Sequence, residues 1–447
     1  MLTAFIRAFR TPDLRRKLLF TLAIIALFRL GASIPTPGIS EKAVNYCTGL
    51  EAASGSAGVY QLVNLFSGGA LLKLSIFALG IMPYITASII LQLLAVVIPR
   101  LETLRQEGQS GQAKITQYTR YLTVGLAILQ STGIVALARS GNLLGTTCSE
   151  KLIPNSSVFT ISTMVVCMTA GTAVIMWLGE LITDRGVGNG MSLMIFTQVI
   201  AVIPGYMLSI YRSKHIFVMV VVLVVAVAIV AFIVFMEQAQ RRIPVQYAKR
   251  MVGRKMYGGT STYIPLKVNQ AGVIPVIFAS SLLYIPQLAA SLFGSTAHPQ
   301  GWVNFIQRYL IMPGTSSAAP TLANSATYMG AFFILIVFFT YFYVSITFNP
   351  TEVADNMKKY GGFIPGIRPG RPTAEYLNYV LTRLTAPGSV YLGLVALIPM
   401  VAFALVGAST QFPFGGTSIL IAVGVGLDTV KQIESQLQQR NYEGFLR

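Results

Sequence analysis

Charged side chains are scarce in this sequence: Asp, Glu, Lys and Arg make up 11% of the 447 residues, while 54% are hydrophobic. A typical soluble domain carries roughly a quarter of its residues as charged side chains. A soluble fold of 48.3 kDa with so few charges would expose a large apolar surface to water. The shortage of charge therefore excludes an ordinary soluble protein and indicates a membrane protein.

Histidine is almost absent as well, with two copies, His215 and His298, both outside the apolar runs. No metalloprotease, serine-hydrolase, phosphate-loop or dinucleotide-binding motif occurs in a supporting context. The apolar runs also lack the carboxylates that proton- or sodium-coupled transporters place near mid-bilayer. We therefore expect no enzyme, no metal and no cofactor, and a secondary transporter of a small solute is the alternative that these absences disfavour.

Three cysteines are too few for a disulfide framework or a metal cluster. Cys167 lies in an apolar run and is expected to pack as a small apolar residue. Cys47 and Cys148 both fall on predicted extracytoplasmic loops, where disulfides persist. A disulfide between Cys47 and Cys148 is therefore a hypothesis.

Long apolar runs are what the sequence has instead. Ten of them approach or exceed the roughly 20 residues that cross a hydrocarbon layer of about 30 Å. They run approximately over Leu18–Pro35, Ile76–Ile98, Tyr121–Ala138, Val158–Leu178, Met191–Tyr211, Ile216–Met236, Ala271–Leu292, Tyr328–Phe348, Val390–Leu405 and Gly415–Val430. The expected fold class is all-α, a polytopic membrane protein with ten transmembrane helices and both termini on one side.

Positive charge is distributed unevenly between the two sides of these spans. Twenty-five of the 33 Lys and Arg residues fall at the N-terminus and in the loops after spans 2, 4, 6, 8 and 10. Loops rich in Lys and Arg stay in the cytoplasm, so both termini are predicted to be cytoplasmic. Arg29 lies inside span 1 near its outer end, where it can extend toward the interface, and we expect a structural role for it.

Two long loops, 237–270 and 348–382, carry eleven of these cations, interleaved with tyrosine, proline and glycine. Positive-inside topology explains part of that number. Topology does not require long ordered loops, however, so a docking surface for a polyanion or a motor protein is the sharper interpretation.

Several segments indicate interrupted or polar helices. Segment 59–72 is apolar but too short to cross, which leaves a re-entrant half-helix or a surface amphipathic helix as alternatives. Pro83 in span 2, and Pro275 and Pro286 in span 7, are predicted to kink their helices. The polar amides near or within spans 2, 3 and 7 are candidates for helix–helix hydrogen bonds.

Seven longer stretches strongly resemble the SecY family of protein-translocation channels, in register over nearly all of Leu18–Val430. These are FSGGALLKLSIFALGIMPYITASIILQLL (Phe66–Leu94), GQSGQAKITQYTRY (Gly108–Tyr121), RGVGNGMSL (Arg185–Leu193), RRIPVQYAKR (Arg241–Arg250), STYIPLKVNQAGVIPVIFASS (Ser261–Ser281), NPTEVADNMKKYGGFIPGIRPG (Asn349–Gly370) and FGGTSIL (Phe414–Leu420). The resemblance implies two pseudo-symmetric five-helix halves around a central pore, with a plug half-helix at about 59–72. The sequence itself contains no convincing internal repeat that would show this symmetry.

The resemblance also assigns positions inside the channel. A pore ring of aliphatic side chains falls on Ile81, Ile85, Met191, Ile195, Ile277 and Ile421. The plug includes Gln61, Asn64, Phe66, Ser67, Gly68 and Gly69. A lateral gate would lie between spans 2–3 and 7–8, with Thr86, Gln92, Gln130 and Asn269 as its candidate polar lining.

The expected domain organisation follows from the same resemblance: a cytoplasmic N-terminus (1–17), an N-terminal half (18–211), a C-terminal half (212–436) and a short cytoplasmic tail (437–447). The implied function is the protein-conducting channel of the Sec translocon in the bacterial inner (plasma) membrane, which passes unfolded polypeptides across and releases membrane helices sideways into lipid. A pore-less insertase is a further alternative, which the aliphatic ring positions disfavour.

The resemblance implies partners for the long basic loops. They are the SecA motor ATPase and the ribosome (rRNA and proteins), beside the small subunits SecE and SecG, signal sequences and nascent chains; anionic lipids are expected from the basic charge. The expected docking residues are Arg241, Arg242, Lys249, Arg250, Arg254, Lys255, Lys358, Lys359 and Arg368.

Overall fold

The computed structural model describes residues 11–46, 68–71, 73–139, 152–155, 157–213, 216–247, 250–252, 255–257, 261–293, 301–310, 322–406 and 416–445. Cys47, Cys148 and the greater part of the expected plug (Gln61, Asn64, Phe66 and Ser67) lie outside these residues. Cys167 is free and partly buried.

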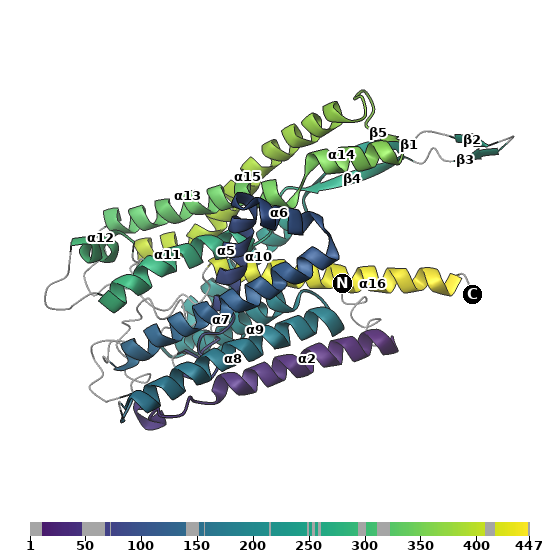
Figure 1. Cartoon of the computed structure of the whole chain (residues 1–447). Coiled ribbons are helices and arrows are strands. Elements are labelled where there is room, and N and C mark those ends of the chain that lie inside the picture. The colour runs from purple at the N-terminus through teal and green to yellow at the C-terminus, as the bar shows by residue number, and fades with distance from the viewer. Residues whose placement is uncertain are drawn as a thin grey trace.

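Within the described residues, one helix corresponds to each of the ten predicted spans (Figure 1). These helices are α2 (Pro12–Ser33), α5 (Met82–Val97), α7 (Gln109–Arg139), α8 (Val158–Arg185), α9 (Gly190–Ser213), α10 (Ile216–Gln238), α11 (Ile274–Phe293), α13 (Leu322–Thr347), α15 (Arg371–Val406) and α16 (Gly416–Phe445). We call these ten helices the helical body, apart from the residues of α10 and α15 that fall within the two long basic loops. Two shorter helices accompany the body. Helix α6 (Pro99–Gln106) follows α5, and α12 (Gly301–Tyr309) precedes α13.

Several helices of the body are long and apolar enough to cross a membrane. In the described part of the chain these are Gln109–Arg139, Val158–Arg185, Ala326–Lys359 and Arg371–Ile398, with the bent pair Met82–Val97 and Pro99–Arg105 as a fifth candidate. Shorter apolar helical stretches occupy Gly190–Gly205, Leu223–Gln238 and Ile274–Leu283.

The second span differs most from its prediction. Residues 76–81 form turns, α5 begins at Met82, and α6 leaves it at an angle of 106°. The prediction that Pro83 kinks this helix is wrong, because Pro83 lies in the first turn, where its missing N–H costs no hydrogen bond. The bend lies at Ile98 instead, since the following Pro99 favours extended backbone there (φ −100°, ψ 111°).

The ends of other helices also differ from the hydropathy pattern. Pro275 is the second residue of α11 rather than a kink, whereas Pro286 lies inside that helix. Helix α15 begins at Arg371, well before the predicted span, and α16 continues to Phe445. Helices therefore extend through most of the expected tail, because a helix does not end where its apolar run ends.

The two long basic loops contain strands that the sequence did not predict. Strands β1 (Gln240–Tyr247), β4 (Ser261–Lys267) and β5 (Gly362–Phe363) form an antiparallel sheet in the order β4–β1–β5. A small hairpin of β2 (Arg250–Val252) and β3 (Lys255–Tyr257) continues from it, and α14 (Pro350–Lys359) lies beside it. We call residues 237–270 and 348–382 together the basic protrusion.

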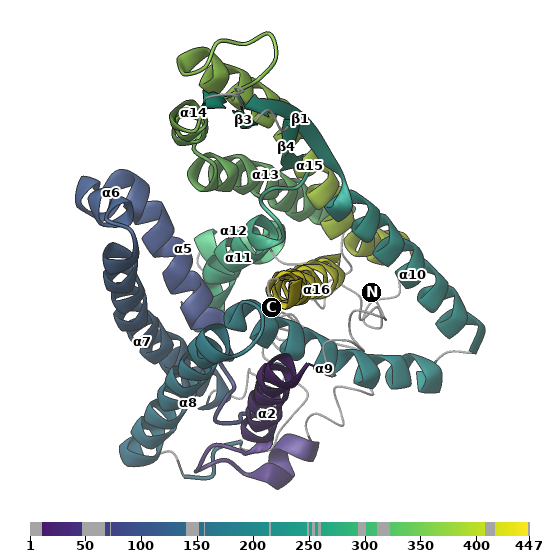
Figure 2. The ribbon, with the colours of Figure 1, turned by 90° about the vertical axis from the view of Figure 1, so that its right-hand side faces the viewer.

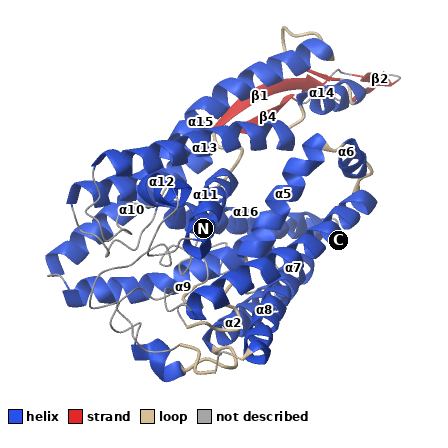
Figure 3. Cartoon of the chain, turned by 60° about the vertical axis from the view of Figure 1, so that its left-hand side comes forward, coloured by secondary structure: helices blue, strands red, loops and turns tan. Residues whose placement is uncertain are grey.

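The basic protrusion and α12 lie at opposite ends of the helical body (Figures 1 and 3). The end with the protrusion also carries the C-terminal end of α16 and the short helix α6. This arrangement places the loops after spans 2, 6 and 8 at one end of the molecule, as the alternation of ten spans predicts.

Seen along the helices, the body encloses α16 near its centre (Figure 2). Helices α5, α6 and α7 stand on one side, facing α11, α13 and α14 on the other. The two sequence halves also meet where α9 packs against α10 and α16. The main hydrophobic cluster draws buried side chains from α2, α5, α8, α9, α10, α11, α13, α15 and α16, and thus joins both halves.

Candidate functional site

The six expected ring residues lie in one hydrophobic cluster, contributed by helices of both halves. Ile81 and Ile421 are each 1% exposed, and Ile85, Ile195 and Ile277 are between 7% and 9% exposed. Met191 is partly buried, and a Cβ at Gly179 of α8 would come within 2.6 Å of its Sδ. The fold thus brings together residues from α9, α11, α16 and the start of α5 that are far apart in the sequence.

Near this cluster, the C-terminal end of the expected plug is held by polar contacts. The Nη1 atom of Arg29 in α2 donates to the carbonyl oxygen of Gly68 at 2.9 Å. Gly68 has φ +68° and lies against the backbone of Gln198 in α9, where a Cβ would come within 3.2 Å. The structural role expected for Arg29 therefore includes a hydrogen bond to one particular backbone carbonyl, that of Gly68.

Gln198 is a buried polar residue that sequence reasoning missed. Its side chain is fully buried, and neither amide atom has a hydrogen-bond partner among the described residues. A buried amide without a hydrogen bond lowers the stability of a folded protein, so such residues are rare. Gln198 is one of them, and it lies beside Gly68 at the end of the expected plug.

The described hydrogen bonds join none of the four expected gate residues to another. Thr86 donates to the carbonyl oxygen of Met82 at 2.9 Å, within its own helix. Gln92 is exposed and contacts Ser88 at 3.4 Å, and Gln130 is half-buried on α7. Asn269 is 3% exposed and lies in the other half, just before α11.

Asn269 bonds within the C-terminal half. Its Nδ2 atom donates to Oε1 of Glu237 at 2.5 Å and to the carbonyl oxygen of Gly272 at 3.2 Å. Nearby, Lys267 at the end of β4 pairs with Asp428 of α16 at 3.8 Å. These contacts fasten the base of the basic protrusion to the end of α10 and to α16.

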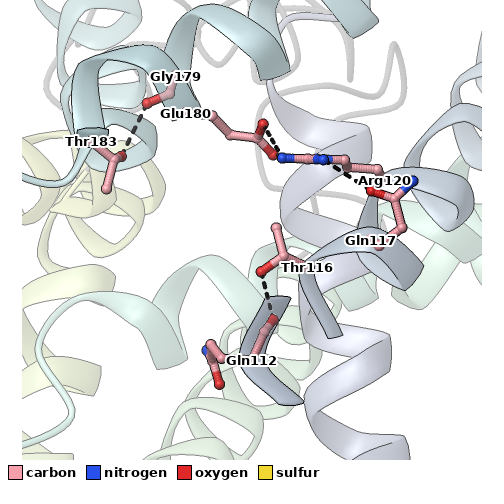
Figure 4. A network of polar contacts seen from close by, with 7 residues as sticks. All are labelled: Gln112, Thr116, Gln117, Arg120, Gly179, Glu180 and Thr183. Atoms are coloured by element: carbon pink, nitrogen blue, oxygen red, sulfur yellow. Dashed lines mark hydrogen bonds and ion pairs between the residues drawn. The ribbon is translucent and has the colours of Figure 1, made fainter. Parts of the chain in front are cut away.

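On the opposite side, α7 and α8 are joined by an ion pair (Figure 4). Arg120 of α7 donates through Nε and Nη2 to the two carboxylate oxygens of Glu180 in α8, at 2.8 and 2.7 Å. Gln117 accepts a third bond from Arg120 at 2.9 Å. A bidentate guanidinium–carboxylate pair fixes orientation as well as distance, so it helps to hold α7 against α8.

The basic protrusion unites the two loops through backbone pairing. Gln246 and Tyr247 of β1 pair with Phe363 and Gly362 of β5. A small hydrophobic core of Ile243, Val245, Leu266, Met357, Ile364, Leu377 and Val380 lies beneath the sheet. The two predicted loops are therefore one folded surface.

The expected docking cations are distributed over this surface. Arg241, Arg242, Lys358, Lys359 and Arg368 are exposed. The guanidinium of Arg242 lies over the ring of Tyr263, 4.9 Å from its centroid, which orients it. The turn at Arg368 is fixed because its carbonyl oxygen accepts from Thr373 Oγ1 at 2.8 Å.

The remaining docking candidates are described less fully. Arg250 lies in β2 and Lys255 in β3, where the backbone alone is described, and Lys249 and Arg254 fall outside the described residues. Among the described residues, no group of three or more His, Cys, Asp or Glu side chains could hold a metal ion.

Comparison with solved structures identifies the class of fold. A solved protein-conducting channel superposes with a TM-score of 0.64 at 20% sequence identity, covering 94% of this chain and 91% of that one. Sec61 in the canine ribosome–channel complex gives a TM-score of 0.62 at 19% identity, again covering 94% and 91%. The fold is that of the protein-conducting channels.

Sequence comparison places the chain more narrowly. The profile of the SecY family matches residues 75–430. The protein translocase subunit SecY of Streptomyces scabiei is 64% identical over 453 residues, and that of Mycobacterium tuberculosis (strain ATCC 25618 / H37Rv) is 60% identical over 454. Both alignments cover the whole of both chains. The chain belongs to the SecY family of protein translocase subunits and is a multi-pass membrane protein.

Proposed function

We propose that this protein conducts unfolded polypeptides through a pore closed by the six ring residues, and carries out no covalent chemistry of its own. The convergence of Ile81, Ile85, Met191, Ile195, Ile277 and Ile421 from four separated segments supports this assignment best. A constriction of uncharged aliphatic side chains excludes ions by dewetting. Because it offers no directional bonds, it also deforms around an extended chain of any sequence.

Two further parts of the channel are proposed near the ring: a plug that closes the pore and a lateral gate that opens it toward lipid. Segment 59–72 would be the plug, and the Arg29–Gly68 bond would fix its C-terminal end to α2. The lateral gate would open between α5/α7 and α11/α13, with Thr86, Gln92, Gln130 and Asn269 near its edges. Because Asn269 bonds within its own half, parting the two sides would leave that bond intact.

Partners would dock on the basic protrusion. Its exposed cations suit the phosphates of ribosomal RNA and the acidic side chains of a SecA-type motor, while SecE and SecG would pack against the helical body. Energy would come from the motor, the ribosome or a proton gradient. The protrusion and both termini would face the cytoplasm of a bacterial inner membrane, where anionic lipids attract the same cations.

The ring assignment is tested by conductance. Purified complex carrying Ile85→Ser and Ile277→Ser is reconstituted in planar bilayers, and resting single-channel current is recorded beside in vitro export. Two hydroxyls in the constriction favour wetting, so we expect resting ion leak with export largely kept.

The matched control is Ile200→Ser, which changes an isoleucine of α9 that is 40% exposed and lies outside the ring. It should remain silent at rest. Resting current equal in the ring double variant and in the unaltered channel would refute the ring.

A further inference from the structure

A side-chain hydrogen bond joins the two halves on the side where α5 and α6 face α13. The Nη2 atom of Arg105, in α6, donates to the carbonyl oxygen of Ile346 at 2.8 Å. Ile346 lies in the last turn of α13, which ends at Thr347. The bond joins segments 241 residues apart, and Figure 2 shows α6 and α13 on facing sides.

The sequence explains why this carbonyl needs an outside donor. In a continuing helix, the carbonyl oxygen of Ile346 would accept from the N–H four residues later, at position 350. That residue is Pro350, which has no N–H. The helix dipole also favours a cation at this end of α13. Arg105 thus satisfies an acceptor that Pro350 leaves open.

Arg105 is held on a rigid support. Gly111 at the start of α7 lies so close to α6 that a Cβ there would overlap the carbonyl oxygen of Leu104. Lys114 pairs with Glu107 at 3.9 Å across the same turn. Since α7 is joined to α8 through Arg120 and Glu180, the support of Arg105 extends through α7 to α8.

Its acceptor is attached equally firmly to the other half. Helix α13 packs against α11 and α15, and Phe278 of α11 contacts Phe339 and Tyr343 of α13 edge-on, at 5.7 and 6.3 Å between ring centroids. Only Phe348 and Asn349 separate α13 from α14 of the basic protrusion. The carbonyl oxygen of Ile346 therefore lies four residues before the first residue of α14.

We propose that Arg105 is a clasp that holds the two halves together at the protrusion end of the lateral gate, and that the gate opens more readily when the bond from Arg105 to the carbonyl oxygen of Ile346 is broken. The inference rests on the proposed channel function. The bond is exposed and can be replaced by water, so it is easily broken and remade. Because its acceptor is a backbone atom, the clasp depends on Arg105 and on the end of α13 rather than on the side chain at position 346.

The test measures the distance between α6 and α13. Spin labels are placed at Glu102→Cys in α6 and Ser345→Cys in α13, both exposed, in full-length complex in nanodiscs with the three native cysteines replaced. Distance distributions are compared for the otherwise unaltered channel and for Arg105→Ala. Loss of one charge-assisted hydrogen bond should raise the ratio of separated to closed populations about fivefold.

The control is Arg100→Ala, which removes an equal charge from the exposed face of the same helix. It should leave the distribution unchanged. Arg105→Lys keeps a donor and should give an intermediate ratio, which keeps the test decisive if the alanine variant assembles poorly. Equal distributions for Arg105→Ala, Arg105→Lys and Arg100→Ala would overturn the clasp.

Export of a reporter with a defective signal sequence is measured in the same variants. An easier gate should raise its export in Arg105→Ala and leave it unchanged in Arg100→Ala. Changed distances with no polypeptide transport by any variant would contradict the channel function and leave the clasp standing. Transport with unchanged distances would contradict the clasp alone.

Discussion

The helical body and the basic protrusion are built on opposite kinds of interaction. In the body, hydroxyls bond back to their own helices, as Thr123 does to Thr119 and Thr340 to Ile336. The surfaces that helices present to one another are therefore mainly apolar and non-directional. In the protrusion, backbone ladders join β4, β1 and β5, and cations stand outside a small core. The body is thus held mainly by apolar packing between helices, while the protrusion holds its cations on a hydrogen-bonded sheet.

The strongest test of this difference reverses a fixed charge. Arg368→Glu should reduce motor-driven export roughly 30-fold, since reversing a central docking contact costs about 2 kcal/mol or more. The channel should still insert into the membrane, because the helical body is untouched. Export by purified motor and channel is measured in vesicles, with channel quantity determined by immunoblot.

Arg371→Glu is the matched variant. Arg371 is exposed three residues away and pairs with Glu375 at 3.1 Å. If placement matters, its reversal should cost much less than that of Arg368. Equal losses would show that the protrusion acts through its total charge, and the contrast with the body would weaken.

A smaller effect should separate phosphate contact from other modes of docking. Replacing Arg241 and Arg242 by Gln removes two cations of β1 and should weaken ribosome binding roughly tenfold at low salt. The slope of log affinity against log salt should fall by about 1.4 to 1.8, because each lost phosphate contact removes about 0.7 to 0.9. Binding is measured by co-sedimentation over a salt series.

Arg139→Gln is the control for this series, since Arg139 ends α7 away from the protrusion. Its salt slope should equal that of the unaltered channel. An unchanged slope in the β1 double variant would mean that these arginines do not contact phosphate.

The smallest expected effect is on the free energy of unfolding, measured after one ion pair is broken in each region. Glu180→Gln breaks the bidentate pair with Arg120 and should lower the free energy of unfolding by about 1 kcal/mol. Glu375→Gln breaks the exposed pair with Arg371 and should cost about 0.5 kcal/mol or less. Unfolding by denaturant in detergent measures both. A larger loss from Glu375→Gln would reverse the expected ranking of the two regions.

The same contrast explains what could be predicted from the sequence. The ten helices followed from apolar runs, because helical hydrogen bonds and span length are local. The sheet did not, because β1 pairs with a strand that lies beyond α11 and α13. The bend at Ile98 is signalled by Pro99, yet Pro83 is the proline that hydropathy placed inside the span.

The residues of the site also divide into those that the sequence can indicate and those that only the folded chain reveals. The ring residues came from the resemblance, since isoleucine in an apolar helix carries no signal of its own. The open carbonyl at Ile346 can be read from Pro350, but its partner Arg105 cannot, because the two halves meet only in the folded chain. Gln198 likewise became visible only through its burial.

The pairing of β1 with β5 also orders events during synthesis. Strands β1 and β4 can pair as soon as both have left the ribosome, but β5 follows two further membrane helices and α14. The edge of the sheet stays unpaired through that interval. The sheet of the basic protrusion is therefore completed only after β5 has been synthesised.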